Sequence, residues 1–532
     1  MIRMEAAGGL AVTTTVDTSA SRAQLIADDT PARLAAKDST LWGPAAEAEA
    51  AVRLGWVDTH ERSRELLPRL AELRTKLRAK GLTRVVLAGM GGSSLAPEVI
   101  TRTLDVPLTV LDTTDPGQIR AALAQDLENT VVVVSSKSGG TVETDSHRRA
   151  FWQAFEDHGL SDIGGRFVIV TDPGSPLETI GNEMGAEVIL ADSDVGGRYS
   201  ALTAFGLVPS YLAGVDVEEL IDQAAEFAAS SQDEKENPAL TLGAALASRP
   251  TVTIAPDGSG IVGLGDWAEQ LIAESTGKDG LGVLPVVVDA PSAPGFTGED
   301  VLAVTVGGSA VAHLPTSGHL ALPDLAVNGP LGAQFLAWEL ATAYAGKLIG
   351  IDPFNQPNVT ESKNNTNAIL EKGLPDEAPR FTEGAVEVYG GEGDTLASAL
   401  RGLLASLGEG GYVSVMAYLD RVADAGAGGL RDLLARATTA PVTFGWGPRF
   451  LHSTGQFHKG GRPTGAFLQI TGAVSDDLDV PGKPFTFGQL QAAQAAGDRQ
   501  ALSSRSYPLL RLHLTDRAQG IAQILAAVKE LA

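Results

Sequence analysis

Short runs of β-branched residues alternate with helical stretches between residues 84 and 192, and this alternation constrains the fold more than any other feature of the chain. Apolar strands that are separated by helices are typical of a parallel sheet covered on both faces. We therefore predict a doubly wound α/β domain whose ligands bind at the carboxyl ends of the strands. The predicted strands are RVVLAGM (84–90), LTVLD (108–112), VVVVSS (131–136), FVIVTD (167–172) and EVILAD (187–192).

The flanking segments extend this organisation in both directions. Residues 59–80 carry leucines near helical spacing and predict a lead-in helix. A second α/β region begins near residue 235, and residues 379–394, which are polar and glycine-rich, are interpreted as a connector. The further predicted strands begin at residues 251, 283, 301, 412, 441, 466 and 509.

A chain of 532 residues exceeds what one hydrophobic core usually organises, so we expect more than one domain. The predicted division is an N-terminal segment (1–58), a first domain (59–230), the first part of a second domain (231–378) and a C-terminal α/β part (379–532) that completes the second domain. Residues 1–45 and 475–532 carry no motif, and the sequence predicts no role for them.

Composition excludes several classes of partner. The net charge of -25 repels nucleic acid and anionic membranes, whereas a small phosphorylated metabolite needs only one local cradle of donors. The absence of cysteine excludes disulfides, thiolate metal sites and a cysteine nucleophile. Neither a signal-peptide pattern nor a run of 18 apolar residues is present, so we expect a cytoplasmic protein.

The loop after the third predicted strand has the composition of a phosphate cradle. Ser136, Lys137, Ser138 and Thr141, interleaved with glycines, precede the start of a helix, where hydroxyls and backbone amides suit a phosphate dianion. An ordinary helix cap needs only one hydroxyl. The first strand ends in the similar GMGGSS (89–94), which by itself is equally consistent with turn chemistry. Neither loop has the pattern of a P-loop or of a dinucleotide-binding fingerprint.

These two loops resemble the sugar-isomerase (SIS) domain superfamily, whose phosphate loop reads SxSGxTxET, and more narrowly the phosphoglucose isomerase family. GMGGSSLAP resembles that family's GIGGSxLGP, and SSKSGGTVET is similar to its SKTFTTxET, although Gly139 and Gly140 replace bulkier residues. The resemblance implies two doubly wound SIS domains of three-layer α/β/α architecture. It also implies that the sugar phosphate is held by Ser93, Ser136, Ser138 and Thr141, with Gly92 and Gly197 beside the substrate.

Aldose–ketose isomerisation needs a base, a cation that stabilises an enediolate, and a group that opens the sugar ring. AESTGKDG (273–280) resembles the family's ESNGK segment, which implies that Glu274 is the base. GGRYS (196–200) resembles GGRxS and implies that Arg198 is the cation. DPFNQPNVTESK (352–363) is similar to NPFDQPGVEAYK, so Lys363 would assist ring opening and Gln356 would lie near the phosphate. Without the family, the glutamate and the lysine are more typical of solvated positions, and the arginine is equally typical of a surface ion pair.

The ring-opening histidine departs from the family's order along the chain. The family places it between the glutamate and the lysine, where this chain has His313 and His319 in unrelated surroundings. FLHSTGQ (450–456) instead resembles the family's DLHSxGQ, so we hypothesise that His452 opens the ring and that this part of the second domain has moved to the carboxyl terminus. His458 is a neighbour in a weaker context, and His452 capping a strand of an added domain is the alternative.

By resemblance, the chain interconverts glucose 6-phosphate and fructose 6-phosphate without a metal or an organic cofactor, as a homodimer in which the partner subunit contributes the histidine. Two alternatives stay open: an enzyme that also accepts mannose 6-phosphate, and a sugar-phosphate sensor without catalysis. A sensor needs only the cradle, so the joint presence of Glu274, Arg198 and Lys363 favours an enzyme.

Overall fold

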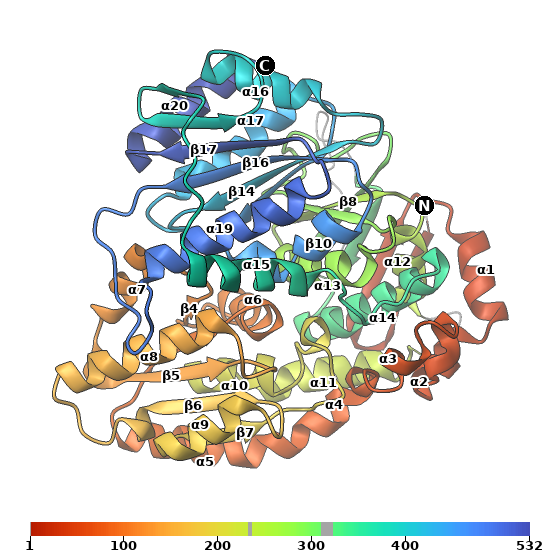
Figure 1. Cartoon of the computed structure of the whole chain (residues 1–532). Coiled ribbons are helices and arrows are strands. Elements are labelled where there is room, and N and C mark those ends of the chain that lie inside the picture. The colour runs from red at the N-terminus through yellow and green to blue at the C-terminus, as the bar shows by residue number, and fades with distance from the viewer. Residues whose placement is uncertain (1, 232–236, 310–322, 532) are drawn as a thin grey trace.

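The described part of the chain, residues 2–231, 237–309 and 323–531 of this computed structural model, forms three β-sheets with helices packed against them (Figure 1). The first sheet is parallel and has the strand order β4-β3-β5-β6-β7. All five strands predicted for this region are confirmed. They are β3 (Arg84–Gly89), β4 (Thr109–Leu111), β5 (Thr130–Ser135), β6 (Phe167–Thr171) and β7 (Glu187–Leu190).

Helices cover both faces of the first sheet because its strands are apolar on both sides. Val85 packs with Phe205 on one face, and the next residue, Val86, packs with Phe151 on the other. This arrangement confirms the three-layer α/β/α prediction. The helices of this region are α5 (Leu67–Ala79), α6 (Leu95–Thr103), α7 (Pro116–Leu123), α8 (Val142–Asp157), α9 (Pro176–Met184) and α10 (Ala204–Ala213).

The lead-in helix is less regular than its leucine spacing predicts. Residues 59–80 form α4 (Thr59–Arg62), a 3₁₀ turn (Ser63–Leu66) and then α5. Pro68 lies at the start of α5, and because proline has no N–H it cannot continue the α-helical hydrogen-bond ladder from the preceding turn. The prediction of one continuous helix is therefore wrong at this point.

The second sheet has the order β1-β2-β11-β10-β8-β9, and its first two strands come from the N-terminal segment. The sequence predicts that residues 1–58 form a separate segment. Leu10 and Val12 are instead fully buried in the core of the second domain, so the N-terminal strands are part of that domain. The short hairpin carried too few residues to be recognised as strands. The strands are β1 (Ile2–Glu5), β2 (Ala11–Thr14), β8 (Thr251–Pro256), β9 (Leu284–Val287), β10 (Val301–Gly307) and β11 (Leu325–Asn328).

Helix α14 (Leu331–Ile349) is the central helix of this second domain, and it is buried on all sides from Leu331 to Gly346. An apolar residue on every side of a helix is expected where other helices surround it. Helix α14 packs against α1 (Ser19–Ala27), α11 (Val217–Ala228), α12 (Pro238–Leu246) and α13 (Leu264–Thr276). The short helices α2 (Thr30–Ala35) and α3 (Glu47–Ala50) belong to the same N-terminal region as α1.

The third sheet, of order β12-β13-β17-β16-β14-β15, occupies the C-terminal part. Residues 379–394 are not a connector: Val386 and Val388 are buried, and Gly384, at a φ of +57°, turns the chain into a hairpin. The strands are β12 (Phe381–Glu383), β13 (Val386–Gly390), β14 (Tyr412–Tyr418), β15 (Val442–Trp446), β16 (Gly465–Gly472) and β17 (Leu509–Leu514), and the helices are α15 (Val359–Lys372), α16 (Leu396–Ala405), α17 (Gly429–Ala437), α18 (Gly455–Gly460), α19 (Phe487–Ser503) and α20 (Arg517–Lys529).

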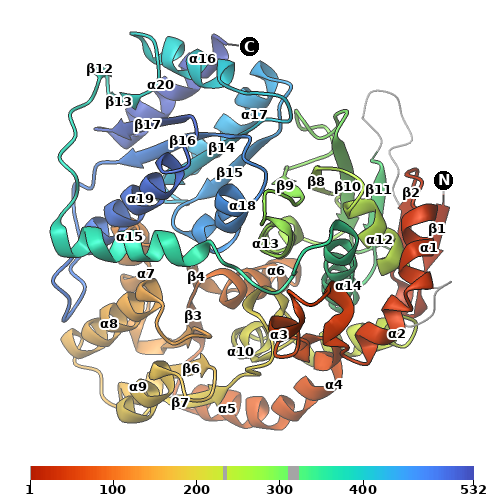
Figure 2. The same cartoon turned by 45° about the vertical axis from the view of Figure 1, so that its right-hand side comes forward.

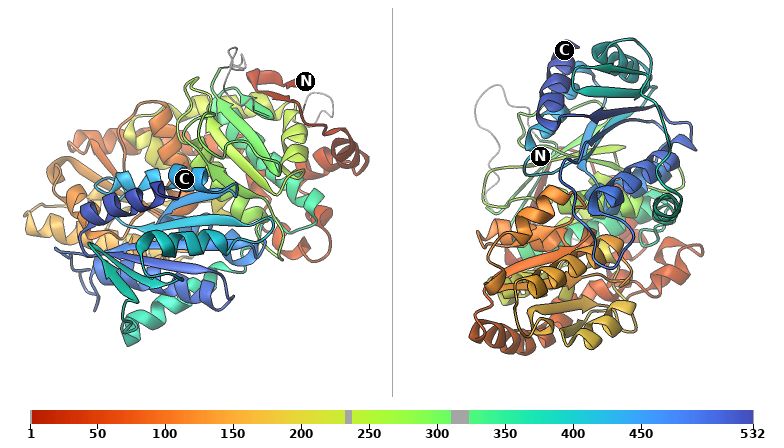
Figure 3. Two further views of the ribbon diagram at one scale, coloured as in Figure 1. Left: turned by 90° about the horizontal axis from the view of Figure 1, so that it is seen from above. Right: turned by 60° about the vertical axis from the view of Figure 1, so that its left-hand side comes forward.

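This third sheet has its own apolar core. The described residues therefore form three sheets, whereas the two expected domains imply two. The third sheet nevertheless joins the second domain, because β15 lies beside β9, and β9 and β14 contribute to a shared core that includes Val286 and Met416. Figures 1 and 2 show α15 and α19 side by side between the third sheet and the first domain, and the right-hand view of Figure 3 shows the third sheet above the first. Within the described ranges, no helix is long and apolar enough to cross a membrane.

Candidate active site

The two predicted phosphate loops lie side by side because β3 and β5 are paired neighbours in the first sheet. The strand order changes direction at this pair, and such a switch point leaves a crevice at the carboxyl ends of the strands. A cavity of about 400 Å³ opens there. Its lining includes eleven of the twelve predicted site residues: Gly92, Ser93, Ser136, Lys137, Ser138, Thr141, Gly197, Glu274, Gln356, Lys363 and His452.

The cradle itself is built from close backbone and hydroxyl contacts. Ser136 Oγ lies 2.9 Å from Thr141 Oγ1, so these two hydroxyl groups are neighbours in the wall of the cavity. Gly92 lies against the loop that follows β7, since a Cβ at this position would stand 1.9 Å from the carbonyl oxygen of Gly197 in that loop. Lys137 lies in the cavity wall, but its ammonium donates to Asp172 Oδ2 at 2.5 Å. The structure thus gives that ammonium a protein partner rather than a free position in the cradle.

Glu274 lies in the last turn of α13 and is 5% exposed. Burial raises the pKa of its carboxyl group, and the positive charge of Arg198 only partly opposes that shift. Arg198 Nη1 stands 3.4 Å from Glu274 Oε2, and Arg198 Nε donates to Ser275 Oγ at 2.9 Å. A buried carboxyl group beside a guanidinium is suited to exchange a proton with a bound molecule.

Arg198 lies behind this cavity rather than in its wall. Its Nη2 donates to the carbonyl oxygens of Pro353 at 2.8 Å and Asn355 at 3.0 Å, and its Nη1 donates to Gln356 Oε1 at 3.2 Å. The arginine therefore connects Glu274 to the turn 352–356, which carries Gln356 to the cavity.

Lys278 holds the same turn from the other side. Its ammonium donates to the carbonyl oxygens of Asp352 at 2.6 Å and Asn355 at 2.7 Å, and to Asn355 Oδ1 at 2.8 Å. Burial, with a contribution from Arg198, lowers the pKa of Lys278 to about 6. Lys278 stands within the AESTGKDG segment, and the sequence predicts no role for it.

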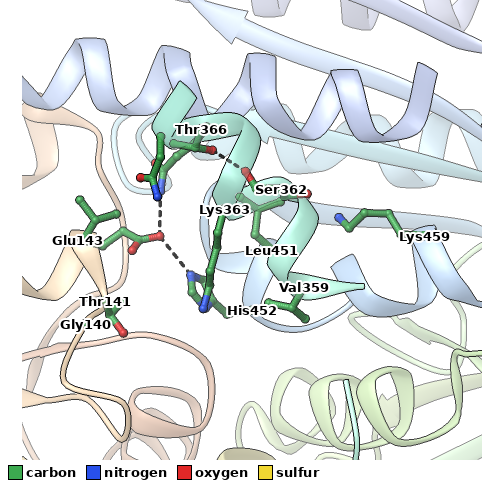
Figure 4. Close-up of a pocket in the computed structure, with 13 residues that line it drawn as sticks. Gly140, Thr141, Glu143, Val359, Ser362, Lys363, Thr366, Leu451, His452 and Lys459 are labelled. Atoms are coloured by element: carbon green, nitrogen blue, oxygen red, sulfur yellow. Dashed lines mark hydrogen bonds and ion pairs between the residues drawn. The ribbon is translucent and has the colours of Figure 1, made fainter. Parts of the chain in front are cut away.

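His452 reaches the cavity from a 3₁₀ turn (Arg449–His452) of the C-terminal part. Its Nε2 lies 3.0 Å from Glu143 Oε1, which also accepts a hydrogen bond from Gln494 Nε2 at 2.7 Å (Figure 4). Burial raises the pKa of Glu143, but His452 outweighs it and the pKa falls to about 2. An ionised Glu143 accepts a hydrogen bond from the imidazole and so orients it toward the cavity.

Lys363 extends from α15 beside His452, as Figure 4 shows. The position of α15 depends on the C-terminal part: Ser362 Oγ donates to Asp498 Oδ1 at 3.3 Å, and Lys459 pairs with the same oxygen at 2.7 Å. Both Lys459 and Asp498 are almost fully buried. The third sheet and its helices thus supply His452 directly and support Lys363.

The sequence offers three other histidines for the ring-opening role. His458 is packed against Tyr412 in the core, and burial lowers its pKa to about 3. His458 is not among the described residues that line the active-site cavity. His313 and His319 lie outside the described residues.

Sequence reasoning missed Glu143, Gln270 and Gln494. Glu143 stands directly after the cradle in the quoted TVET, and that position was its only signal. Gln270 lies one turn before Glu274 on α13 and lines the same cavity. Gln494 comes from the carboxyl-terminal region that carried no motif.

All of these side chains belong to one chain. The resemblance implied that a partner subunit contributes the histidine, yet here His452 of the same chain stands beside Glu143. Among the described residues, no group of three or more histidine, aspartate or glutamate side chains is placed to hold a metal ion.

A phosphate-type cradle at the switch point of a parallel sheet, with a buried glutamate and a histidine–glutamate pair, is the arrangement of a phosphosugar isomerase. The comparisons with known proteins agree. Residues 59–279 match the family model described as Phosphoglucose isomerase. The probable glucose-6-phosphate isomerase of Haloarcula marismortui is 31% identical over 354 residues, which are 56% of this chain and 80% of that protein.

The glucose-6-phosphate isomerase of Rubrobacter xylanophilus is 30% identical over 379 residues, which are 58% of this chain and 87% of that protein. The crystal structure of a glucose-6-phosphate isomerase from Chlamydia trachomatis shares the fold, with a TM-score of 0.56 and 22% identity over 70% of this chain and 90% of that one. The chain belongs to the phosphoglucose isomerase family. The prediction that it is an isomerase is confirmed.

Proposed function

We propose that this protein interconverts glucose 6-phosphate and fructose 6-phosphate through an enediolate, with Glu274 as the base. The observation that carries the proposal is the position of Glu274: a buried carboxyl group with a raised pKa, in the wall of the cavity that also contains the cradle hydroxyls. In this proposal the cradle binds the phosphate, and the sugar extends from it toward Glu274 on α13, in the wall of the same cavity.

Ring opening precedes the proton transfer. His452, oriented by Glu143, donates a proton to the ring oxygen, and the C1–O5 bond breaks to give the aldehyde. Lys363 stands beside His452 and binds the sugar oxygens with its ammonium. The proton lost from the C1 hydroxyl passes to a base or to water, so the open aldose and the ring have the same composition.

In the isomerisation step, ionised Glu274 removes the proton from C2. The electron pair of that bond forms the C1=C2 double bond, and the carbonyl π electrons move to O1 as the enediolate forms. Glu274 then returns its proton to C1 while the O2 proton transfers to O1, which leaves the carbonyl at C2. Arg198, which contacts Glu274 from the side away from the cavity, supplies the positive charge that favours the anionic enediolate.

The family supports the finer predictions without testing them. A homodimer, a cytoplasmic location and a role in sugar-phosphate metabolism remain predictions, as does the possibility that mannose 6-phosphate is also a substrate. The wall of the cavity combines Glu274, His452 and Lys363 of one chain, and our proposal assigns the reaction to these residues without one from a partner subunit.

The test is a coupled assay with glucose 6-phosphate and mannose 6-phosphate, comparing the wild type with Glu274→Gln. We expect kcat to fall by about 10²–10⁴-fold, which is the usual contribution of a general base. Glu269→Gln is the matched control: it removes a carboxyl group whose pKa burial raises to about 8, on the same helix but lining a different cavity. Unchanged turnover by Glu274→Gln would exclude the proposed mechanism.

A further inference from the structure

A second cavity, of about 500 Å³, lies between the third sheet and α19, on the side of that helix away from Glu143. Its lining comes from β13, β14, β16, β17, α19, residues 374–377 and the loop after β16. None of the cradle residues or proposed catalytic residues belongs to its described lining. The family's reaction gives this cavity no role.

The strand register places polar side chains in two neighbouring rows on the cavity face of the sheet. Gln469, Arg511 and Tyr389 stand opposite one another on β16, β17 and β13. Two residues further along, Thr471, His513 and Glu387 form the next row. Side chains alternate along a strand, so both rows lie on one face, while the intervening residues, such as Ile470 and Leu512, form the apolar core on the other.

Two arginines in this cavity share one carboxylate. Arg499 Nη1, from α19, donates to Glu377 Oε2 at 2.5 Å, and Arg511 Nη1 lies 3.4 Å from the same oxygen. The guanidinium of Arg511 also stacks on the ring of Tyr389, 3.6 Å from its centroid. The arginine side chains are 14% and 18% exposed, whereas the Glu377 side chain is 39% exposed and comes from the segment that joins α15 to β12. The segment between α15 and β12 thus brings the Glu377 carboxylate to two arginines of the cavity wall.

Several buried polar atoms of the lining have no hydrogen-bond partner among the described residues. Gln469 is fully buried and its Nε2 donates to the carbonyl oxygen of Ala495, but its Oε1 is unpartnered. The hydroxyl of Tyr418 and the Nε atoms of Arg499 and Arg511 are also unpartnered. Buried polar groups normally find a partner, so these atoms indicate that the cavity accommodates a polar molecule.

We propose that this cavity is a second ligand site, which binds a small organic anion whose phosphate or carboxylate group replaces the Glu377 carboxylate between Arg499 and Arg511. Guanidinium groups bind both kinds of anion through paired, charge-assisted hydrogen bonds. The hydroxyl of Tyr418 and Oε1 of Gln469 provide a donor and an acceptor for hydroxyl groups on the same molecule.

The test is calorimetric titration of the full-length protein with two probes, inorganic phosphate and citrate, which separate phosphate from carboxylate recognition. Arg499→Gln and Arg511→Gln each remove one charge-assisted contact, so we expect roughly tenfold weaker binding of the preferred probe. Glu377→Gln removes the competing carboxylate and should tighten binding. Arg401→Gln, an exposed arginine of α16, is the matched control and should leave the affinity unchanged.

The arginine variants should weaken binding of the probe and the glutamate variant should tighten it. Neither misfolding nor phosphate bound at the cradle would produce that combination. A damaged variant loses affinity, whereas Glu377→Gln must gain it, and none of the substituted residues belongs to the described lining of the active-site cavity. If Glu377→Gln binds neither probe more tightly and the arginine variants bind both as the wild type does, Glu377 is a structural contact and the proposal is wrong.

Discussion

His452 Nε2 lies 3.0 Å from Oε1 of Glu143, although 309 positions separate the two residues along the chain. The pair joins the C-terminal part to the first helix turn after the cradle. If His452 opens the ring, His452→Ala should lower kcat on the cyclic sugar by about 10²-fold or more and affect the open-chain form much less. Assays with the equilibrated substrate, which is mainly cyclic, and with a shorter aldose phosphate that cannot close a ring measure the difference, and His158→Ala, at a largely exposed histidine, should change neither.

The single-chain composition of the site predicts the outcome of mixing two inactive variants. If each site is built from one chain, a mixture of Glu274→Gln and His452→Ala subunits stays inactive after they are unfolded and refolded together. If sites were shared across a homodimer, statistical mixing would restore about a quarter of them. Recovered activity in the mixed sample, measured against each variant refolded alone, would contradict the single-chain site.

The acid limb of the pH profile should report Glu274. The base must be ionised, so kcat/KM falls as the pH drops through the pKa of Glu274, which burial holds above its ordinary value of 4.5. Arg198 opposes that rise, so Arg198→Gln should move the acid limb to still higher pH. Profiles of kcat/KM for the two proteins provide the comparison, and a limb that moves to lower pH would contradict this assignment.

Close packing of α19 on α15 should control the position of Lys363. A Cβ at Gly497 would lie 2.8 Å from Thr366 Oγ1 and 2.9 Å from the backbone nitrogen of Thr366. Gly497→Val should therefore displace α15 and lower kcat/KM by about 10²-fold, the usual cost of displacing a reacting group by an ångström. Gly402→Ala is the control, since the nearest atom to its Cβ would stand at 3.6 Å. Activity equal to the wild type in a folded Gly497→Val protein would show that α15 adjusts freely.

An ion-pair cluster between the first domain and the C-terminal part should make stability depend on acid. Arg449 contacts Asp112, and its Nη2 lies 2.6 Å from Glu98 Oε2. Burial raises the pKa of Glu98, but Arg449 and Arg421 outweigh it, and the pKa falls from 4.5 to about 2. Because the folded pKa is depressed, the stabilisation is complete above pH 4.5 and is lost as the pH falls toward 2.

The lowered pKa of Glu98 corresponds to a stabilisation of about 3 kcal/mol. Urea unfolding at pH 7, 4.5 and 3 should show the free energy of unfolding of the wild type falling between the last two values. Arg449→Gln should be less stable at pH 7 and less dependent on pH in that interval. Arg64→Gln, which removes an exposed ion pair with Asp222, should behave as the wild type does.

Much of the fold was predictable because strands and helices leave local periodicity. Val131 to Val134 are apolar in succession, as a strand covered on both faces must be, and β5 lies where this run predicts it. The N-terminal hairpin was not predictable in this way: Ala11 to Thr14 are buried only because β11, over 300 residues later, pairs with them. Likewise, Val386 and Val388 are strand residues because β17 lies beside them.

The cradle hydroxyls, Glu274 and Lys363 were recognisable as candidates because each stands in a short motif that resembles one of the family's, and the structure brings them to one cavity. Which charges face one another was not. Lys137 reads as a phosphate ligand in the sequence, yet Asp172, at the end of the next strand, takes its ammonium. Glu143 reads as an ordinary helix residue, yet it meets an imidazole from a different sheet. Partners of this kind are set by the packing of distant segments, since the energy of a charge depends on what surrounds it in space and not on its neighbours in sequence.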